Sequence, residues 1–265
     1  MPFLELVEPW TQQPNHLVRP NRDIIPDLSH LWVPLGTQAG YWDIAGGWHA
    51  FNVANYTWGF GQHGPCGRGD GSTGLWGEKG AYTAVDFGRD WASDVSSVVS
   101  SNTVFALVEF ESLSSGAEFS ILRVDAATGN YMLALDVFPS TKTVRPLCKT
   151  SGTSGWSVNN DKVHNEIVIN TPLLVAYRYN NGAPIESVVC PVGGKPVWTK
   201  TATNVSGGVR QQAATGNYAH IGGFGNNGAA TSFPGKITYV SMVPYPMNDH
   251  LFAEICKNPW IVIEP

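Results

Sequence analysis

The chain has 265 residues, of which 14% are charged, and its formal net charge is −5. It shows no cluster of lysine and arginine that could bind a nucleic-acid backbone, so nucleic-acid binding is excluded. Its apolar runs are far shorter than the roughly 20 residues of a membrane-spanning helix, so insertion into a membrane is excluded as well. Glycine (29 residues), proline (18) and aromatic residues (11%) are abundant, which favours a compact all-β protein with many turns.

Residues 1–47 are predicted to form an extended, irregular N-terminal arm. Four prolines occur by position 20, and proline is excluded from central strands. Four large side chains are expected to hold this arm on the body and to anchor the protein in an assembly: Trp10, Leu31, Trp32 and Trp42. The first residues lack the basic and apolar regions of a secretion signal, so the four scattered cysteines are expected to be free thiols.

Residues 48–265 are predicted to form one body of short strands. Strand-like segments recur between turns rich in glycine, asparagine and proline. The sequence RYNNGAP predicts a hairpin with a type I′ turn, because Asn-Gly tolerates positive φ. The candidate strands are 48–54, 80–88, 103–112, 117–125, 130–138, 142–150, 165–172, 173–180, 185–192, 218–224 and 236–245.

One short helix is predicted near the C-terminus. Asn248 suits the N-cap position, and Leu251, Phe252, Ile255 and Cys256 fall on one face. Asn258 is expected to end the helix in a left-handed conformation before Pro259, with a strand or strap after it. About a dozen short strands with one peripheral helix predict a two-sheet sandwich or jelly roll.

Several segments carry a resemblance to a known family. The segments LLVAYRYNNGAP and YAHIGGFGNNGAATSFPGKITYVSMVPYPMNDHLFAEICKNPW resemble the concanavalin A-like, laminin-G-like jelly rolls. The ending NPW and the opening WTQQP are similar to proteins of tailed bacteriophages and prophages. The resemblance covers residues 165–265 well, the first 15 weakly and the middle only by pattern.

The resemblance implies a virion structural protein that is not an enzyme and needs no cofactor. Such a protein would decorate the capsid or form a head or tail appendage, contact other virion proteins through its N-terminal arm, and form a homo-oligomer. It would be assembled in the cytoplasm of the bacterial host, and it could also bind a host-surface glycan. Two alternatives stay open, a carbohydrate-binding adhesion module and a glycoside hydrolase.

Three sequence patterns resemble reactive or ligand-binding sites. Glu109 and Glu111 share one face of a strand, as glycosidase carboxylates do, but the third acid expected of the related enzymes is missing. GFGNNG matches a dinucleotide motif but no helix is expected to follow, so a turn is favoured. HGPCGRGDGSTG has two potential zinc ligands and an Arg-Gly-Asp tripeptide, and a long flexible loop is the preferred interpretation.

Aromatic residues in glycine- and serine-rich stretches are the candidate ligand-binding residues. Aromatic rings can stack on sugars, although burial in the core explains many of them equally well. The candidates are Trp58, Phe60, Trp76 and Trp156. Oxygen-rich loops at 159–166 and 224–232 lack the alternating acids of a strong calcium site, so no metal is predicted.

Overall fold

The computed structural model describes the greater part of the chain. The described residues are 19–33, 40–45, 50–51, 56–61, 64–70, 98–99, 101–116, 118–126, 130–148, 158–159, 161–205, 209–210, 217–226 and 229–264.

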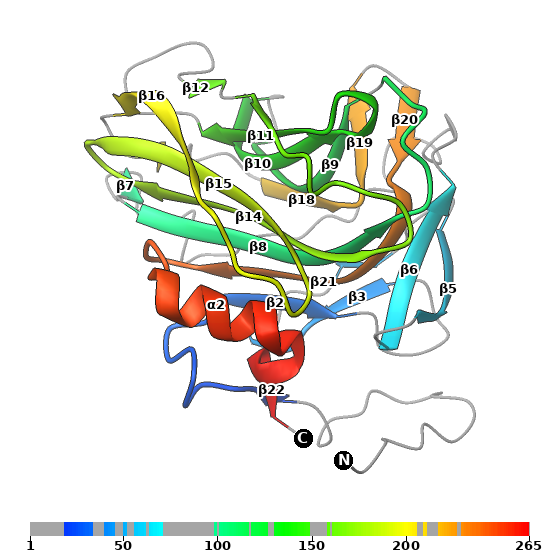
Figure 1. Cartoon of the computed structure of the whole chain (residues 1–265), viewed down its shortest axis with the longest axis horizontal. Coiled ribbons are helices and arrows are strands. Elements are labelled where there is room, and N and C mark those ends of the chain that lie inside the picture. The colour runs from blue at the N-terminus through cyan, green and yellow to red at the C-terminus, as the bar shows by residue number, and fades with distance from the viewer. Residues whose placement is uncertain are drawn as a thin grey trace.

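These residues form a β-sandwich of two antiparallel sheets, which confirms the predicted fold class (Figure 1). The large sheet has the order β16-β15-β14-β8-β21-β2-β3-β4, with β6 paired to β21 and β5 to β6. Its bounds are β2 His30–Val33, β3 Gly40–Asp43, β4 Ala50–Phe51, β5 Tyr56–Gly61, β6 Gly64–Asp70, β8 Ser101–Phe110, β14 Pro172–Asn180, β15 Ala183–Pro191, β16 Thr199–Val205 and β21 Pro234–Val243.

The second sheet has the order β12-β11-β10-β9-β18, with β13 also paired to β11. Its strands are β9 Phe119–Ala126, β10 Asn130–Phe138, β11 Thr143–Cys148, β12 Val158–Asn159, β13 Lys162–Val163 and β18 Asn217–Ile221. The 3₁₀ helix η1 Pro139–Thr141 joins β10 to β11. Three strand pairs stand apart from the two sheets: β1 Arg19–Pro20 with β22 Ile263–Glu264, β7 Val98–Val99 with β17 Val209–Arg210, and β19 Gly223–Asn226 with β20 Ala229–Ser232.

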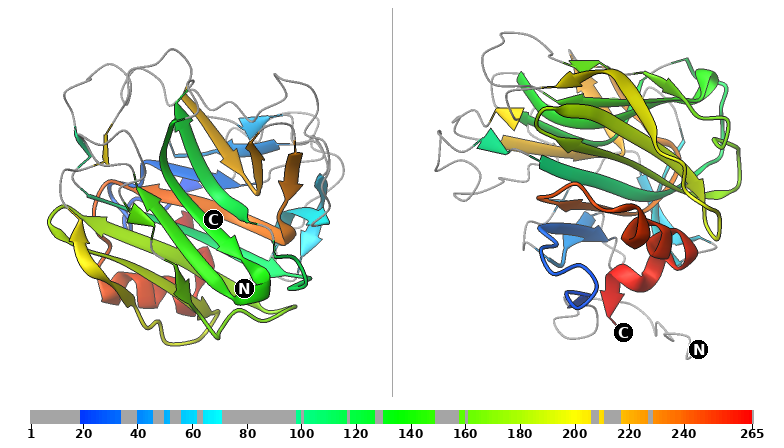
Figure 2. Two further views of the ribbon diagram at one scale, coloured as in Figure 1. Left: turned by 90° about the horizontal axis from the view of Figure 1, so that it is seen from above. Right: turned by 60° about the vertical axis from the view of Figure 1, so that its left-hand side comes forward.

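The large sheet is buried on both faces, so the molecule has three layers (Figures 1 and 2). Between the two sheets lies a core that includes Phe119, Val137 and Tyr177. A second core on the opposite face of the large sheet packs against helix α2 (Asp249–Lys257) and the segment before β2. Burial on both faces explains why β8 and β21 are nearly continuous apolar runs rather than alternating ones.

The predicted hairpin at RYNNGAP is confirmed, but its turn type is not. Strands β14 and β15 pair antiparallel on either side of Asn181-Gly182. Gly182 has a φ of 81°, whereas Asn181 is not among the residues with positive φ. A type I′ turn needs positive φ at both central residues, so that prediction was wrong.

The predicted C-terminal helix is present. The Asn248 side chain accepts a hydrogen bond from the backbone N–H of Leu251 at 2.8 Å, and Phe252, Ile255 and Cys256 are buried. Asn258 differs from the prediction: its φ is −138°, and its side chain instead accepts from the N–H of Trp260. It therefore caps the 3₁₀ helix η2 (Pro259–Val262), which suits the fixed φ of Pro259.

Part of the predicted N-terminal arm belongs to the large sheet. Strand β2 pairs with β21, and the side chains of Leu31 and Trp32 are fully buried. Pro20 and Pro26 precede this strand without preventing it, so the proline count underestimated the order of the segment. Residues 1–18 lie outside the described part of the chain, and the domain boundary at residue 47 stays a prediction.

Candidate functional site

The predicted ligand-binding aromatics are not tested by the structure. Trp58 and Phe60 lie in β5, which pairs with β6, but their side chains are outside the description. Trp76 and Trp156 fall outside the described residues altogether. Their role in ligand binding therefore stays a prediction.

Two of the four predicted anchor residues contribute to the protein's own cores. Trp32 points into the core between the sheets, and Leu31 packs in the core beneath α2. Trp42 lies in β3 opposite Val33, with its side chain undescribed, and Trp10 is outside the described residues. Leu31 and Trp32 thus hold the segment on the body, as expected, while a role for the set in assembly stays a prediction.

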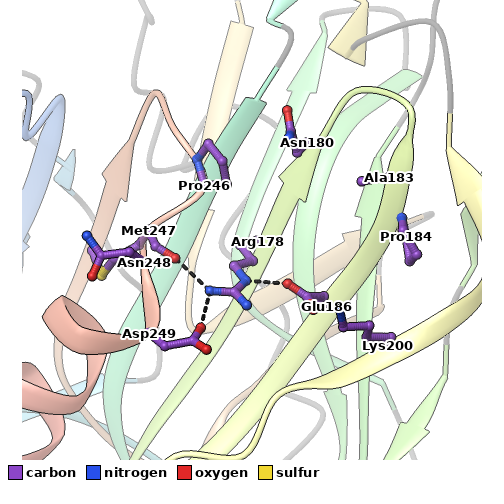
Figure 3. Close-up of a pocket in the computed structure, with 10 residues that line it drawn as sticks. All are labelled: Arg178, Asn180, Ala183, Pro184, Glu186, Lys200, Pro246, Met247, Asn248 and Asp249. Atoms are coloured by element: carbon purple, nitrogen blue, oxygen red, sulfur yellow. Dashed lines mark hydrogen bonds and ion pairs between the residues drawn. The ribbon is translucent and has the colours of Figure 1, made fainter.

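A pocket of about 460 Å³ lies where the β14–β15 hairpin meets the start of α2 (Figure 3). Strands β14, β15 and β16 supply part of its lining, and the segment that leads into α2 supplies the rest. The lining residues are Arg178, Asn180, Ala183, Pro184, Glu186, Lys200, Pro246, Met247, Asn248 and Asp249.

Arg178 is the centre of the pocket's charge network (Figure 3). Its Nε pairs with the Glu186 carboxylate, and its Nη1 donates to the carbonyl of Met247 at 2.7 Å and to Asp249 at 2.6 Å. The guanidinium also lies over the Trp198 ring, 4.1 Å from the ring centroid. These contacts fix the guanidinium and tie the hairpin to the helix start.

The pocket combines charged groups with a small apolar wall. The Lys200 ammonium lies 3.2 Å from Glu186 Oε1 and is 69% exposed, while Asp249 is 75% exposed. Ala183, Pro184 and Pro246 carry no side-chain polar group. A ligand in this pocket would meet both hydrogen-bonding groups and aliphatic carbon.

Sequence reasoning missed this pocket, although the hairpin contained a signal for it. Arg178 and Glu186 are each four residues from Gly182, and the observed register makes them direct cross-strand partners. Opposite charges placed symmetrically about a predicted hairpin turn indicate such a pair. The contribution of Asp249 depends on a contact 71 residues away and could not be read from the hairpin.

Glu109 and Glu111 lie on one side of the strand, as predicted, and both approach the same lysine. Lys236 Nζ lies 2.6 Å from Glu109 Oε1 and 3.4 Å from Glu111 Oε1. The two carboxylates raise the pKa of Lys236, chiefly through the hydrogen bond that its ammonium donates to Glu109. The arrangement is a cluster of two carboxylates that share one ammonium from the adjacent strand β21.

A buried histidine and serine also lie within hydrogen-bond distance. His164 Nε2 is 3.0 Å from Ser187 Oγ, and both residues are almost completely buried. Burial lowers the pKa of His164, and the nearby Glu166 carboxylate opposes that effect. Because Ser187 shares a strand face with Ile185 and Val189 of the inter-sheet core, the pair lies inside the sandwich rather than in the pocket.

A second polar network lies on the second sheet. Ser120 donates to Asp136 Oδ1 at 2.5 Å, and Arg145 makes a bidentate pair with Asp161 and a 3.3 Å contact with Glu118. Burial raises the pKa of Asp136 well above its usual range, despite the opposing effect of the Arg123 guanidinium. Among the described residues, no group of three potential ligands could hold a metal ion.

Two glycine-rich motifs have ordered backbone in the structure. Residues 64–70, with the Arg-Gly-Asp tripeptide, form β6 between β5 and β21, so the predicted long loop at 63–74 is wrong over this stretch. Glycine permits the extended backbone there, and the sheet supplies the hydrogen bonds. The first four residues of GFGNNG form β19, and the next described element is strand β20, so a strand rather than a helix follows the motif, as predicted.

By sequence, no protein-family model and no curated protein matches the chain. Its structure is similar to a Trypanosoma rangeli sialidase solved with sialic acid (TM-score 0.53, 16% identity), covering 89% of this chain and 34% of the sialidase. It is also similar to the binding domain of Paraclostridial Mosquitocidal Protein 1 (TM-score 0.54, 8% identity), covering 88% of this chain and 52% of that one. The chain thus spans about a third to a half of these proteins, and the likeness shows a shared β-sandwich fold.

In the described part of the chain, no helix has the length and apolar character needed to span a membrane. The described α-helix, α2, has nine residues.

Proposed function

We propose that this chain is a non-enzymatic β-sandwich that binds a carbohydrate in the pocket of Figure 3. The observation that carries the proposal is the make-up of that pocket, whose lining combines carboxylates, amides and cations with the aliphatic side chains of alanine and proline. A sugar ring likewise offers both polar and apolar surface, because it has a rim of hydroxyl groups and faces of C–H groups. Pockets of this size with a few fixed polar groups are typical ligand sites.

A solved protein of similar fold supports this choice of ligand class, because it was solved with sialic acid. A second protein of similar fold is named a binding domain, which fits a binding function without naming a ligand. The orientation of Arg178 adds support, because a guanidinium fixed by two carboxylates and a carbonyl costs little entropy when a ligand arrives.

A glycan array followed by calorimetry tests the proposal. Asn180 and Lys200 are exposed, so N180A and K200A should fold normally and weaken binding of the array-selected glycan by about tenfold each. The matched control is K195A, another exposed lysine that does not line the pocket, and it should bind like the wild type. If no glycan on the array binds, the carbohydrate proposal is wrong. If the N180A/K200A double variant binds the glycan with full affinity, the glycan binds outside this pocket.

The non-enzymatic part of the proposal is supported by the carboxylates of the sequence motif. Glu109 and Glu111 share Lys236, which leaves neither placed as a free acid or nucleophile. The purified protein should show no glycosidase activity of its own, and any trace activity from a contaminant should be unchanged in E109Q/E111Q. Loss of activity in that variant would support a glycoside hydrolase instead.

We infer that the protein binds this carbohydrate as a component of a tailed-bacteriophage particle. Support comes from the sequence resemblance over residues 165–265, which here form the pocket hairpin, β21 and α2. In this setting the protein is a homo-oligomer attached to capsid or tail proteins through its N-terminal residues. Removing residues 1–20 should prevent incorporation into particles while leaving glycan affinity unchanged; normal incorporation of the truncated chain would contradict the anchoring role.

A further inference from the structure

Two buried cysteines meet between helix α2 and the large sheet. Cys190 is the second-last residue of β15, and Cys256 is the second-last residue of α2. Both are free thiols with at most 1% of their surface exposed, and both belong to the core beneath the helix. They are 66 positions apart in sequence, so only the packing of α2 on the sheet brings them together.

Contacts between the end of α2 and the turn after β15 hold the two cysteines near each other. The N–H of Gly193 donates to the carbonyl of Cys256 at 2.7 Å, which fixes the end of α2 against the turn that follows Cys190. At this contact the two cysteine side chains are close enough for each to shift the pKa of the other. Cys190 Sγ donates to the carbonyl of Pro191 at 3.4 Å, and Gly194 leaves space beside the sulfur, because a Cβ at that position would lie only 3.3 Å from it.

We infer that Cys190 and Cys256 form a reversible disulfide that locks α2 onto the large sheet when the protein meets a disulfide oxidant. The locked helix begins at Asn248 and Asp249, which line the pocket of Figure 3, so the disulfide also steadies one wall of that pocket. The inference stands on the packing of the cysteines and does not depend on the identity of the pocket's ligand.

The reaction is a thiol–disulfide exchange with a low-molecular-weight disulfide. The Cys190 thiolate attacks one sulfur of the oxidant, forming a mixed disulfide and releasing one thiolate. Cys256 then gives its proton to that thiolate, and its sulfur attacks Cys190 and displaces the second thiolate, which takes up the proton that Cys190 lost when it ionised. Two electrons pass to the oxidant, which leaves as two thiols.

The thiol environment assigns these roles to the two residues. The hydrogen bond from Cys256 lowers the pKa of the Cys190 thiol, while the same contact and burial raise the pKa of Cys256. Cys190 is therefore the sulfur that ionises first and attacks. Because both sulfurs are buried, local opening of α2 sets the rate of oxidation in the folded protein.

Peptide mapping of the full chain tests the inference directly. The protein is unfolded and refolded in a buffer of reduced and oxidised glutathione, so that access to the thiols does not limit the outcome. Each of the four cysteines falls in a different tryptic peptide, at 23–68, 143–149, 179–200 and 237–257. The expected product is a crosslink between 179–200 and 237–257 that dithiothreitol removes. Free thiols, or a crosslink to another peptide, would overturn the inference.

Thermal unfolding gives a second readout. Oxidation should raise the Tm by roughly 5 °C or more, because the crosslink closes a long loop of the unfolded chain. The increase should disappear in C190S and in C256S, and it should survive in C66S. An oxidation-dependent increase that persists in C190S would assign the effect to other cysteines.

Discussion

The buried imidazole of His164 makes the stability of the protein depend on pH. Its pKa in the folded state is lowered by burial, whereas in the unfolded chain it is near 6.5. Because the folded pKa of His164 is lowered, the unfolded chain takes up this proton at a higher pH than the folded protein does. The effect of His164 on the unfolding free energy is therefore absent above about pH 6.5, and it lowers that free energy as the pH drops toward the folded pKa.

Replacing His164 should therefore make the unfolding free energy depend less on pH in the acidic range. We expect H164N to show a smaller loss of unfolding free energy between about pH 6.5 and 5 than the wild type, as measured by urea unfolding at each pH. The control is H250N, because His250 is an exposed residue of α2. If H164N and H250N show the same pH dependence, the buried imidazole is not the source.

At the level of elements, strand β21 depends on a glycine that permits close contact with β8. A Cβ on Gly235 would lie 2.0 Å from the carbonyl oxygen of Glu109, a backbone atom that cannot rotate aside. The two strands also change register between Ile237 and Tyr239, so their spacing is not free to relax uniformly.

G235A should consequently destabilise the protein by about 3 kcal/mol, as measured by urea unfolding. The matched control is G116A, where the nearest atom to the added Cβ is Ser140 Oγ at 3.8 Å, and its effect should be within about 0.5 kcal/mol. Equal stability of the two variants would show that the strands can separate at Gly235.

At the level of the whole molecule, the two cores share the large sheet and should unfold together. Phe252 belongs to the core beneath α2 and Val137 to the core between the sheets, and both are fully buried. F252A and V137A should each lower the unfolding free energy by about 2–4 kcal/mol and leave one cooperative transition. Far-UV circular dichroism and tryptophan fluorescence should give the same midpoint in each variant; separate midpoints would mean that the cores are independent.

Local patterns in the sequence determined the fold class, the β14–β15 hairpin and the C-terminal helix. These features depend on residues that are close in sequence: a turn at Asn181-Gly182, an N-cap at Asn248, and the apolar face of α2 between Leu251 and Cys256. Such signals act over a few positions and can be read without the fold. The same is true of the rejected dinucleotide motif, which needs a helix directly after it.

Only the tertiary structure decided which distant residues meet. The pocket joins Arg178 to Asp249, the sheet joins Glu109 to Lys236, and the packing of α2 joins Cys190 to Cys256. It also placed β2 inside the large sheet, although proline suggested an irregular arm. The physical reason is that strand order and layer packing minimise exposed apolar surface over the whole chain, and no local pattern records which partner a strand or helix will find.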